Sequence, residues 1–372
     1  MSRARARAGN NNNNRRFIAP LRAQSARRKL KRDFVRCATF RSTTRRFPMK
    51  HLPPSAAASP APSSSPARTI AVLPTRPLSL VPRESAPEER PQLCRLSDLL
   101  GAWGDDAQAA FDARTSGKAR GPITGLPGLD RELGGCFAPG VHIAHGQPGA
   151  GKTAFALQVA ASCNTPCLYL TCEMAPLELL RRLTARLTGT FLGRLKSGEM
   201  RPADSLELAS RAAGQAPQLA LVDGTRAYAS PGYLRECAEI ARGDHPHLLI
   251  VVDSLHAWTE SAPPVGATEY DTLNMGLLAL KRLTAELNCP LLAIAERNRG
   301  AMQGGGMSAG AGTRKIEYGA ETVLDLERGE GARADMSGEV EVKAKLCKNR
   351  HGAAGKSLPL KFHGALQRFT EA

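Results

Sequence analysis

One glycine-rich turn between an apolar strand and an apolar helix constrains the fold of this chain more than any other stretch. Residues 141–160 read Val-His-Ile-Ala-His-Gly-Gln-Pro-Gly-Ala-Gly-Lys-Thr-Ala-Phe-Ala-Leu-Gln-Val-Ala. Gly146, Gly151, Lys152 and Thr153 fit the G-x-x-x-x-G-K-[ST] pattern of a phosphate-binding loop. Such a loop needs glycines because its backbone curves closely around an anion, with the positive end of a helix behind it. The stretch therefore predicts a nucleoside-triphosphate site.

The residue types of this loop also predict its cofactors. The lysine of such a loop reaches the β- and γ-phosphates and the threonine hydroxyl is a ligand for Mg²⁺, so we expect ATP and Mg²⁺. The alternative is a chance match in a chain with 35 glycines, which the flanking apolar strand and helix disfavour. The expected nucleotide-binding residues are Gly146, Gln147, Pro148, Gly149, Ala150, Gly151, Lys152, Thr153 and Ala154.

Positive charge is concentrated at the start of the chain. The sequence has 51 Lys and Arg against 34 Asp and Glu, which gives a net charge of +17. Residues 1–50 hold 16 of the basic residues and one acid, Asp33, so the other 322 residues carry a net charge of only +2. Any nucleic-acid surface on the folded part must therefore be local.

The first 118 residues divide into three segments by composition. We expect residues 1–50 to be a basic disordered tail: a nucleic-acid arm, an organelle-type presequence, or an over-extension upstream of a start at Met49. Over-extension or a passive tail is the favoured interpretation. Residues 51–92 are rich in proline, serine and alanine, which predicts a flexible linker. Within residues 93–118, apolar spacing predicts an amphipathic helix at about 95–115 that packs either on its own domain or on a neighbouring subunit.

The nine cysteines show no paired C-x-x-C motifs. Most lie inside apolar runs, so we interpret them as buried thiols in a reducing cytosol; Cys163 and Cys167 alone are a weak metal signal. No apolar run approaches the ~18 residues of a membrane span. No apolar segment follows the N-terminal arginines, so a secretory signal is not expected.

From about residue 119, short apolar runs alternate with helical patterns. We expect strands near 141–145, 167–171, 218–222, 248–252 and 290–295, and helices near 151–163, 176–188, 203–214, 230–242 and 270–287. This alternation predicts an α/β fold of the P-loop NTPase class, a mainly parallel sheet with helices on both faces. Further strands are expected near 323–326, 340–346, 358–362 and 366–369, as an antiparallel C-terminal extension of the sheet within one ATPase domain at 119–372.

Two acids that follow predicted strands are candidates for the chemistry. Asp253 ends an apolar strand, where phosphate-loop enzymes place an acid that binds Mg²⁺ through water, so we expect it at the metal with Thr153. The alternative is an ordinary aspartate at a strand end. Glu173 follows the strand near 167–171, where a carboxylate beside the phosphate loop can activate a water. The residues alone support this role and a plain surface acid equally.

Taken in order, these motifs resemble the RecA-like motor domain of DnaB-type replicative helicases, from about Pro122 to Phe369. The first part of the resemblance lies in Ile-Thr-Gly-x-x-x-Leu-Asp at 123–130, the phosphate loop at 146–153, Glu-Met at 173–174, Arg-Leu-Thr at 182–184 and Ile-Val-Val-Asp at 250–253. The second part lies in Leu-Ala-Leu-Lys-Arg-Leu-Thr-Ala-Glu-Leu-Asn-Cys-Pro at 278–290, Asn-Arg at 298–299, Ile-Glu at 316–317, Cys-Lys-Asn-Arg-His-Gly at 347–352, Gly355 and Arg-Phe at 368–369. The order and spacing of so many elements make the match specific.

The resemblance implies an ATP-hydrolysing helicase or translocase, a homo-hexameric ring around single-stranded DNA. Glu173 matches the family's catalytic glutamate, and Lys152 the lysine of its phosphate loop. Arg350 matches the arginine finger, which in that family reaches the neighbouring subunit's γ-phosphate, and Lys348 matches the lysine beside it. For these two the alternative is a solvated hairpin tip. Replication proteins as partners, a cytoplasmic, nucleoid-associated location and no membrane association are also implied.

The sequence departs from the family pattern at two places. The family usually has glutamine where this chain has Glu296, at the end of a strand from which that side chain can sense the γ-phosphate. An acid there repels a triphosphate unless it is protonated or bound to Mg²⁺. The folded N-terminal domain of replicative helicases also has no counterpart in residues 1–92, and the helix at 95–115 resembles the family's linker helix.

DNA contacts are expected on loops that would face the pore of a ring. The candidates are residues 255–268 and the glycine-rich 299–315, with Arg299, Arg314 and Lys315 as phosphate contacts. The glycines of the second loop either let a DNA strand approach the backbone closely or simply make the loop flexible. The main alternative function is a RecA-family ATPase of the RadA or KaiC kind, in recombination or signalling without unwinding. A nucleotide-switched binding module with little turnover is the third.

Overall fold

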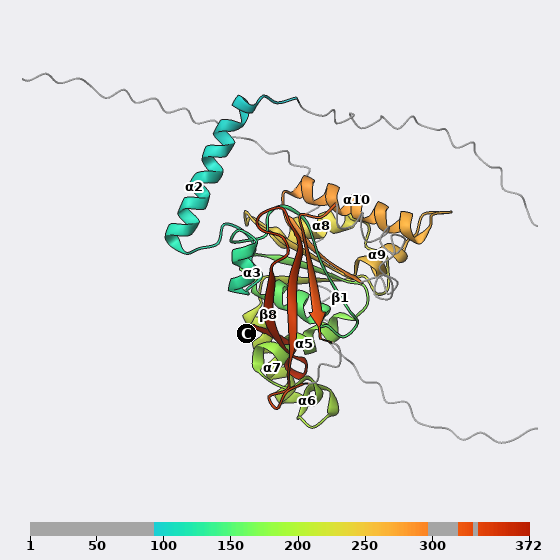
Figure 1. Cartoon of the computed structure of the whole chain (residues 1–372). Helices are drawn as coiled ribbons and strands as arrows, with labels where there is room; N and C mark the ends of the chain where they lie inside the picture. The colour runs from blue at the N-terminus through green and yellow to red at the C-terminus, as the bar shows by residue number, and fades with distance from the viewer. Residues whose placement is uncertain (1–92, 297–318, 330–333) are drawn as a thin grey trace, which may run out of the picture. The chain divides into compact units, whose positions relative to one another are not determined.

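The computed structural model describes residues 93–296, 319–329 and 334–372 (Figure 1), and contacts group the described residues from 95 onward into one unit. The predictions for the tail at 1–50 and the linker at 51–92 lie outside the described residues. The whole glycine-rich segment at 299–315 lies outside them as well.

One mixed sheet holds the nine strands that the described residues form. Its spatial order is β3-β2-β4-β5-β1-β6-β7-β8-β9. Neighbours from β3 to β6 run parallel, and those from β6 to β9 run antiparallel. The strands are β1 (Gly140–Gly146), β2 (Cys167–Thr171), β3 (Leu219–Asp223), β4 (Leu249–Asp253), β5 (Pro290–Glu296), β6 (Thr322–Arg328), β7 (Glu339–Asn349), β8 (Ser357–His363) and β9 (Arg368–Glu371). The predicted parallel sheet with an antiparallel C-terminal extension is confirmed.

Helices cover both faces of the sheet. Helices α4 and α5 pack on one face, and α8, α9 and α10 pack on the other (Figure 1). Over the described residues the helices are η1 (Leu96–Leu99), α2 (Leu100–Ser116), α3 (Pro127–Glu132), α4 (Lys152–Ser162), α5 (Pro176–Thr188), α6 (Leu192–Ser197), α7 (Pro202–Gln215), α8 (Pro231–Arg242), α9 (Leu255–Glu260), α10 (Glu269–Leu287) and η2 (Gly364–Leu366). None of them, in the part of the chain described, is long and apolar enough to cross a membrane.

Successive residues of the parallel strands contribute to two separate cores. In β4, Leu249 and Val251 belong to the core under α4 and α5, whereas Ile250 and Val252 belong to the core under α8, α9 and α10. Because side chains alternate along a strand, a strand buried on both faces must be apolar at every position. This is why β4 appears in the sequence as an unbroken apolar run.

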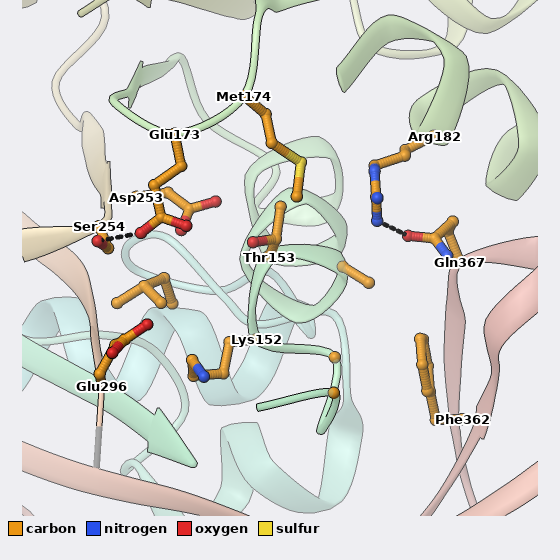
Figure 2. Close-up of a pocket in the computed structure, with 14 residues that line it drawn as sticks. Lys152, Thr153, Glu173, Met174, Arg182, Asp253, Ser254, Glu296, Phe362 and Gln367 are labelled. Carbon is orange, nitrogen blue, oxygen red and sulfur yellow. Dashed lines mark hydrogen bonds between the residues drawn. The ribbon is translucent and has the colours of Figure 1, made fainter. Parts of the chain in front are cut away.

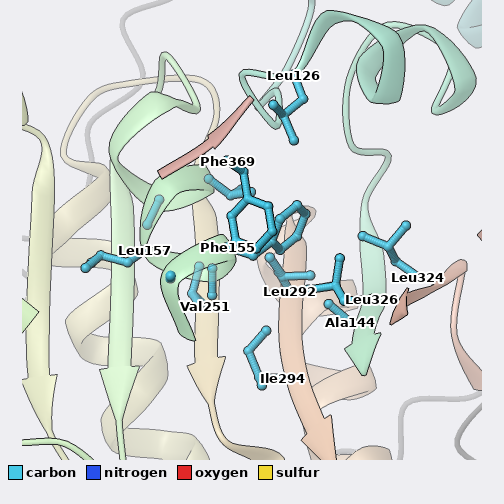
Figure 3. Close-up of a cluster of buried hydrophobic side chains, with 14 of the residues drawn as sticks. Leu126, Ala144, Phe155, Leu157, Val251, Leu292, Ile294, Leu324, Leu326 and Phe369 are labelled. Atoms are coloured by element: carbon cyan, nitrogen blue, oxygen red, sulfur yellow. The ribbon is translucent and has the colours of Figure 1, made fainter. Parts of the chain in front are cut away.

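The last strand is held against the phosphate-loop helix by a buried glutamine. Gln158 of α4 donates to the carbonyl of Phe369 at 2.9 Å and accepts from its amide at 2.8 Å. Beside them, the rings of Phe155 and Phe369 meet edge to face with centroids 5.9 Å apart (Figure 3). These contacts fix the antiparallel strands next to the start of α4, where they form one wall of the functional site.

Most predicted elements have boundaries within a residue or two of the observed ones. Three short helices, α3, α6 and α9, were not predicted, because each has only six residues and periodicity needs a longer window. Helix α9 corrects one expectation, since residues 255–268 were treated as a loop. Its Leu255 and Trp258 are at most 1% exposed, so the first half of that segment packs into the core.

The predicted helix at 95–115 is present as η1 and α2. No residue of either helix, all of which the structure describes, is buried. Leu100 is 69% exposed, Trp103 76% and Phe111 64%. Packing of this helix on its own domain was one of two alternatives, and these exposures do not support it.

The prediction that most cysteines are buried thiols is confirmed in the described residues. All eight cysteines in the described residues are free of disulfides, and Cys136, Cys163, Cys167, Cys237 and Cys289 are buried. Cys94 and Cys347 are exposed, so burial does not extend to every cysteine.

Candidate functional site: a nucleotide pocket at the ends of the parallel strands

The glycines of the phosphate loop are required by close packing. A Cβ on Gly146 would lie 2.6 Å from the backbone oxygen of Leu326 on the neighbouring β6. Gly151 has φ +89°, a conformation that strongly favours glycine, and a Cβ there would lie 2.9 Å from Cζ of Phe369. The loop therefore keeps its curve only with glycine at both positions, and α4 starts directly after it.

Lys152 is held inside the curve of the loop. Its Nζ donates to the backbone oxygen of Gly146 at 3.0 Å and to that of Gln147 at 3.3 Å. These carbonyls orient the ammonium within the loop whose backbone would surround a phosphate. Lys152 thus lies where a cation can contact the outer phosphates of a bound nucleotide.

A cavity of about 270 Å³ opens beside the loop (Figure 2). It lies at the carboxyl ends of the parallel strands, which is where open α/β sheets bind ligands. The cavity is lined by residues of α4, α5, β4, β5 and β8 and by residues that follow β1, β2, β4 and η2: Gly149, Gly151, Lys152, Thr153, Ala154, Glu173, Met174, Arg182, Asp253, Ser254, Ile294, Glu296, Phe362 and Gln367. Five of the nine predicted loop residues, both candidate acids and Glu296 therefore meet at one cavity. The other four predicted loop residues, Gly146, Gln147, Pro148 and Ala150, are not among the residues that line it.

Asp253 ends β4 and is only 4% exposed. The phenol of Tyr169 donates to its Oδ2 at 2.6 Å, and the hydroxyl of Thr153 is also hydrogen-bonded to it. Burial raises the pKa of Asp253, and the bonds from Tyr169 and Thr153 oppose that rise. Two oxygen-bearing side chains, a hydroxyl and a carboxylate, thus meet beside the loop.

This oxygen pair fits Mg²⁺. The ion prefers hard oxygen ligands, and it is commonly held by one or two carboxylates together with waters and substrate phosphates. The described residues contain no cluster of three or more His, Cys, Asp or Glu that could form an all-protein metal site. The pair Thr153 and Asp253 is therefore suited to an ion that arrives with a nucleotide.

Glu173 lies just beyond β2, on the exposed rim of the cavity. Its Oε1 accepts a short hydrogen bond from the hydroxyl of Ser254, the residue after Asp253 (Figure 2). The ends of β2 and β4 are also joined by their backbones, since the amide of Cys172 donates to the oxygen of Asp253 at 2.7 Å. A carboxylate oriented in this way, with access to solvent, can accept a proton from a water.

Several negatively charged side chains lie close together around these acids. Burial and then the charges of Asp253, Glu173 and Asp223 raise the pKa of the Cys172 thiol to about 12. Glu296, the last residue of β5, adds another carboxylate to the cavity lining. A divalent cation would relieve this excess of negative charge before a triphosphate binds.

A further wall of the cavity was not predicted from the sequence. Arg182 of α5 donates to Oε1 of Gln367 at 2.6 Å, and its Nε lies 3.4 Å from Oε1 of Glu178 (Figure 2). The ring of Phe362 stacks on that of Phe369 with centroids 4.5 Å apart. Because Arg182 and Gln367 are 185 residues apart, no local pattern could have paired them.

Lys348 and Arg350 are placed apart from the other predicted catalytic residues. Lys348 lies near the end of β7 and Arg350 directly after that strand, and neither is among the residues that line the cavity. The side chain of Arg350 is half exposed, at 50%, and its Nη1 lies 2.9 Å from Oε1 of Glu321. The predicted catalytic set therefore does not assemble within one chain.

The predicted DNA contacts Arg299, Arg314 and Lys315 lie outside the described residues. The same is true of the Asn-Arg pair at 298–299 and the Ile-Glu pair at 316–317. Their roles stay predictions.

Sequence comparisons identify a family for the chain. A profile of the family described as "DnaB-like helicase C terminal domain" matches residues 121–371. The replicative DNA helicase DnaB of Treponema pallidum is 26% identical over 264 residues, which cover 67% of this chain and 56% of that protein. The DnaB of Geobacillus stearothermophilus is 24% identical over 268 residues, 70% of this chain and 58% of that protein. The chain thus spans about half the length of the curated relatives it matches.

Solved structures show the same fold. An isolated ATPase domain superposes with a TM-score of 0.63 at 17% identity, covering 76% of this chain and 100% of that domain. A DnaB-like replicative helicase, whose structure was described with its interactions with primase, gives a TM-score of 0.61 at 17% identity, covering 76% of this chain and 68% of the other. At this identity the likeness establishes the RecA-like ATPase fold. Since the family profile extends from the lead-in to the last strand, the chain belongs to the DnaB-like helicase C-terminal domain family.

Proposed function

We propose that this chain is an ATP-hydrolysing motor that works as a homo-hexameric ring on single-stranded DNA, as a replicative helicase or translocase. The observation that carries the proposal is the division of the predicted catalytic residues. Lys152, Asp253 and Glu173 surround one cavity, whereas Arg350 lies outside it on the turn after β7. A site divided in this way is completed when a second subunit supplies the missing arginine.

Within the cavity each side chain has a distinct task. Lys152 binds the outer phosphates, and Thr153 and Asp253 hold Mg²⁺, which neutralises negative charge on the phosphates when it is bound. Glu173 orients the attacking water and accepts its proton, and the hydrogen bond from Ser254 fixes the direction of its carboxylate.

The arginine supplied across a subunit boundary couples hydrolysis to assembly. Removing such a finger costs roughly 10³–10⁵ in kcat. Helix α2 is the candidate for holding the ring together, because Leu100, Trp103 and Phe111 leave apolar surface exposed in the single chain. We propose that this helix docks on the neighbouring subunit. A chain that begins at Lys118 should then sediment as a monomer with a folded ATPase domain, whereas a hexamer would contradict docking.

Single-stranded DNA is proposed to pass through the ring along Arg299, Arg314 and Lys315. Phosphate contacts make binding salt-dependent, so replacing all three with alanine should lower both affinity and the salt slope. Removing residues 1–92, which include the tail with net charge +15, should lower DNA affinity only at low salt. Replication proteins as partners and a cytoplasmic, nucleoid-associated location belong to the same proposal.

Two activity measurements on the full chain test the function. The first is steady-state ATPase with and without single-stranded DNA, for which we expect stimulation by DNA and loss in Lys152→Ala. The second is unwinding of a forked duplex, which separates a helicase from a RecA-family ATPase of the RadA or KaiC kind. DNA-stimulated ATPase without unwinding would favour that alternative, and absence of turnover would favour a nucleotide-switched binding module.

A further inference from the structure

Glu321 lies where the parallel and antiparallel parts of the sheet join. It directly precedes β6, and its amide donates to the backbone oxygen of Val141 in β1 at 2.7 Å. Its own carbonyl accepts from the amide of Arg350 at 3.1 Å. The backbone of Glu321 therefore links a central strand of the ATPase sheet to the turn that carries Arg350.

The side chain of Glu321 makes a second set of contacts with the same turn. Its Oε1 accepts from Nη1 of Arg350 at 2.9 Å, and its Oε2 lies 3.3 Å from Nε2 of His351. The carboxylate is 20% exposed, whereas the Arg350 side chain is 50% exposed. One carboxylate thus contacts two consecutive residues of the turn, and half of the arginine surface still faces solvent.

The position of this carboxylate is fixed by close packing. Gly140, with φ +127°, lies beneath the side chain, and a Cβ there would lie 2.6 Å from Cγ of Glu321. Asn349, the residue before Arg350, donates to the backbone oxygen of Glu132 at 2.7 Å. Packing against Gly140 restricts the Glu321 side chain and the Asn349 bond restricts the turn, so Glu321 can act as a fixed partner for the arginine.

We propose that Glu321 is the positioning residue of the Arg350 finger; the inference rests on the proposed function, in which Arg350 completes the site of the neighbouring subunit. A long arginine side chain on a surface turn samples many rotamers, and ordering it for catalysis costs conformational entropy. A fixed carboxylate that pairs with Nη1 restricts the guanidinium in advance. Because a guanidinium has five N–H donors, this contact is compatible with a phosphate contact by the others.

The pairing is not assigned a stabilising role. Ion pairs with a half-exposed partner contribute little to folding, because solvent screens them. The prediction is instead a catalytic one: Glu321→Gln should lower kcat by about 10–100-fold, the range expected for a misplaced group, with the KM for ATP nearly unchanged. Glu339→Gln is the matched control. The Glu339 side chain has the same 20% exposure, and its Oε2 lies 3.8 Å from Nζ of Lys361. Both residues belong to the β7–β8 hairpin, at the end away from the turn that carries Arg350.

Mixing experiments assign Glu321 to one side of the subunit interface. If it acts through Arg350 of its own chain, Glu321→Gln and Arg350→Ala damage the same half of the site. Subunit exchange between Glu321→Gln and Glu173→Gln should then restore ATPase, and exchange between Glu321→Gln and Arg350→Ala should not. A variant that only unfolds the chain would restore activity with neither partner, and its melting temperature would fall.

A double variant gives a second test that does not depend on subunit exchange. On an Arg350→Ala background, Glu321→Gln should cause no further loss of kcat, because its effect passes through the missing arginine. A further loss close to that of the single variant would overturn the inference. Wild-type or increased ATPase in Glu321→Gln would overturn it too, and an increase would mean that the carboxylate sequesters the arginine.

The two levels of the proposal fail in different ways. If Arg350→Ala mixed with Glu173→Gln regains no activity although subunits exchange, Arg350 does not act across an interface, and both proposals are wrong. If that pair regains activity and Glu321→Gln also regains it with Arg350→Ala, only the assignment of Glu321 is wrong.

Discussion

The phenol of Tyr169 lies 2.6 Å from Oδ2 of Asp253 and donates a hydrogen bond to it within the sheet. Tyr169 is fully buried and Asp253 is 4% exposed, so no bulk water competes for the contact. Burial raises the pKa of Asp253, and the phenol favours the ionised form that a cation needs. The tyrosine therefore orients the carboxylate and supports its charge.

Replacing Tyr169 by phenylalanine tests this arrangement. The change leaves the buried Asp253 without one donor, which should lower the free energy of unfolding by about 1–3 kcal/mol. Because Tyr169 orients the proposed metal ligand Asp253, loss of its hydrogen bond should also raise the Mg²⁺ concentration needed for half-maximal ATPase by roughly tenfold. Urea unfolding and a Mg²⁺ titration measure the two effects, with Tyr228→Phe, at an exposed site, as the control. Unchanged stability and Mg²⁺ dependence would refute the assigned role.

Lys152→Ala should separate binding from folding. In the described residues, the Lys152 ammonium donates hydrogen bonds only to the loop carbonyls of Gly146 and Gln147. Its removal should therefore leave the packing of the two hydrophobic cores unchanged. We expect ATP affinity or turnover to fall by about 100-fold or more, since a charge-assisted contact to phosphate is lost. Binding of a fluorescent ATP analogue and thermal melting measure the two properties. Wild-type turnover in this variant would exclude the cavity as the active site.

Glu296→Gln restores the amide that the family usually carries at the end of this strand. Because Glu296 lines the cavity beside Lys152, its charge should repel a triphosphate when Mg²⁺ is scarce. The variant is expected to bind ATP a few-fold more tightly at low Mg²⁺, with the difference shrinking as Mg²⁺ is raised. Calorimetric titration at two Mg²⁺ concentrations measures this. Weaker binding at both would mean that Glu296 itself helps to hold the ion.

His142 should make stability depend on pH. Burial lowers the pKa of His142 from 6.5 to about 4, and the ring bonds Ala138 through Nε2 and Thr322 through Nδ1. Between about pH 6.5 and pH 4, His142 is therefore protonated in the unfolded chain and neutral in the folded chain. The free energy of unfolding should have its full value above pH 6.5 and fall by up to about 3 kcal/mol as the pH is lowered to 4.

The contribution of His142 is isolated by comparison with His142→Gln. Other groups titrate in both proteins, and the charges of His351 and Glu321 act on His142. The difference in unfolding free energy between the two proteins, measured by urea titration from pH 7 to 4, should narrow as the pH falls. Parallel pH curves would show that burial of His142 is not linked to protonation.

The strands and the phosphate loop could be predicted because their signals are local. An unbroken apolar run that ends in an acid places β4 and Asp253 without any knowledge of neighbours. The contacts that orient the site are not local. The bond from Tyr169 to Asp253 spans 84 residues and that from Arg350 to Glu321 spans 29. Helix α9 was missed for another reason, since Ser254 caps only six residues.

The family resemblance predicted roles that the cavity alone would not suggest. Among the described residues, Arg350 lies outside the cavity and pairs with Glu321, and these surroundings do not mark it as catalytic. Its assignment rests on its position two residues after Lys348 and before a glycine turn. The departure at Glu296 was visible in the sequence, but its place in the cavity lining needed the fold.

The central claim is that each active site takes Glu173 from one subunit and Arg350 from the next. Glu173→Gln and Arg350→Ala should each be nearly inactive alone, since loss of a finger costs roughly 10³–10⁵ in rate. After mixing with subunit exchange, an Arg350→Ala subunit beside a Glu173→Gln neighbour has its own glutamate and a borrowed arginine. Random assortment around a cyclic ring completes about a quarter of the interfaces.

ATPase activity of this mixture is the most direct measurement, with exchange followed by labelled subunits. We expect activity to return when the two inactive proteins are mixed. Coordinated firing around the ring could hold the recovery below a quarter, so its sign matters more than its size. An arginine acting within its own chain cannot produce recovery, and exchange without any return of ATPase would contradict the division of each site between two subunits.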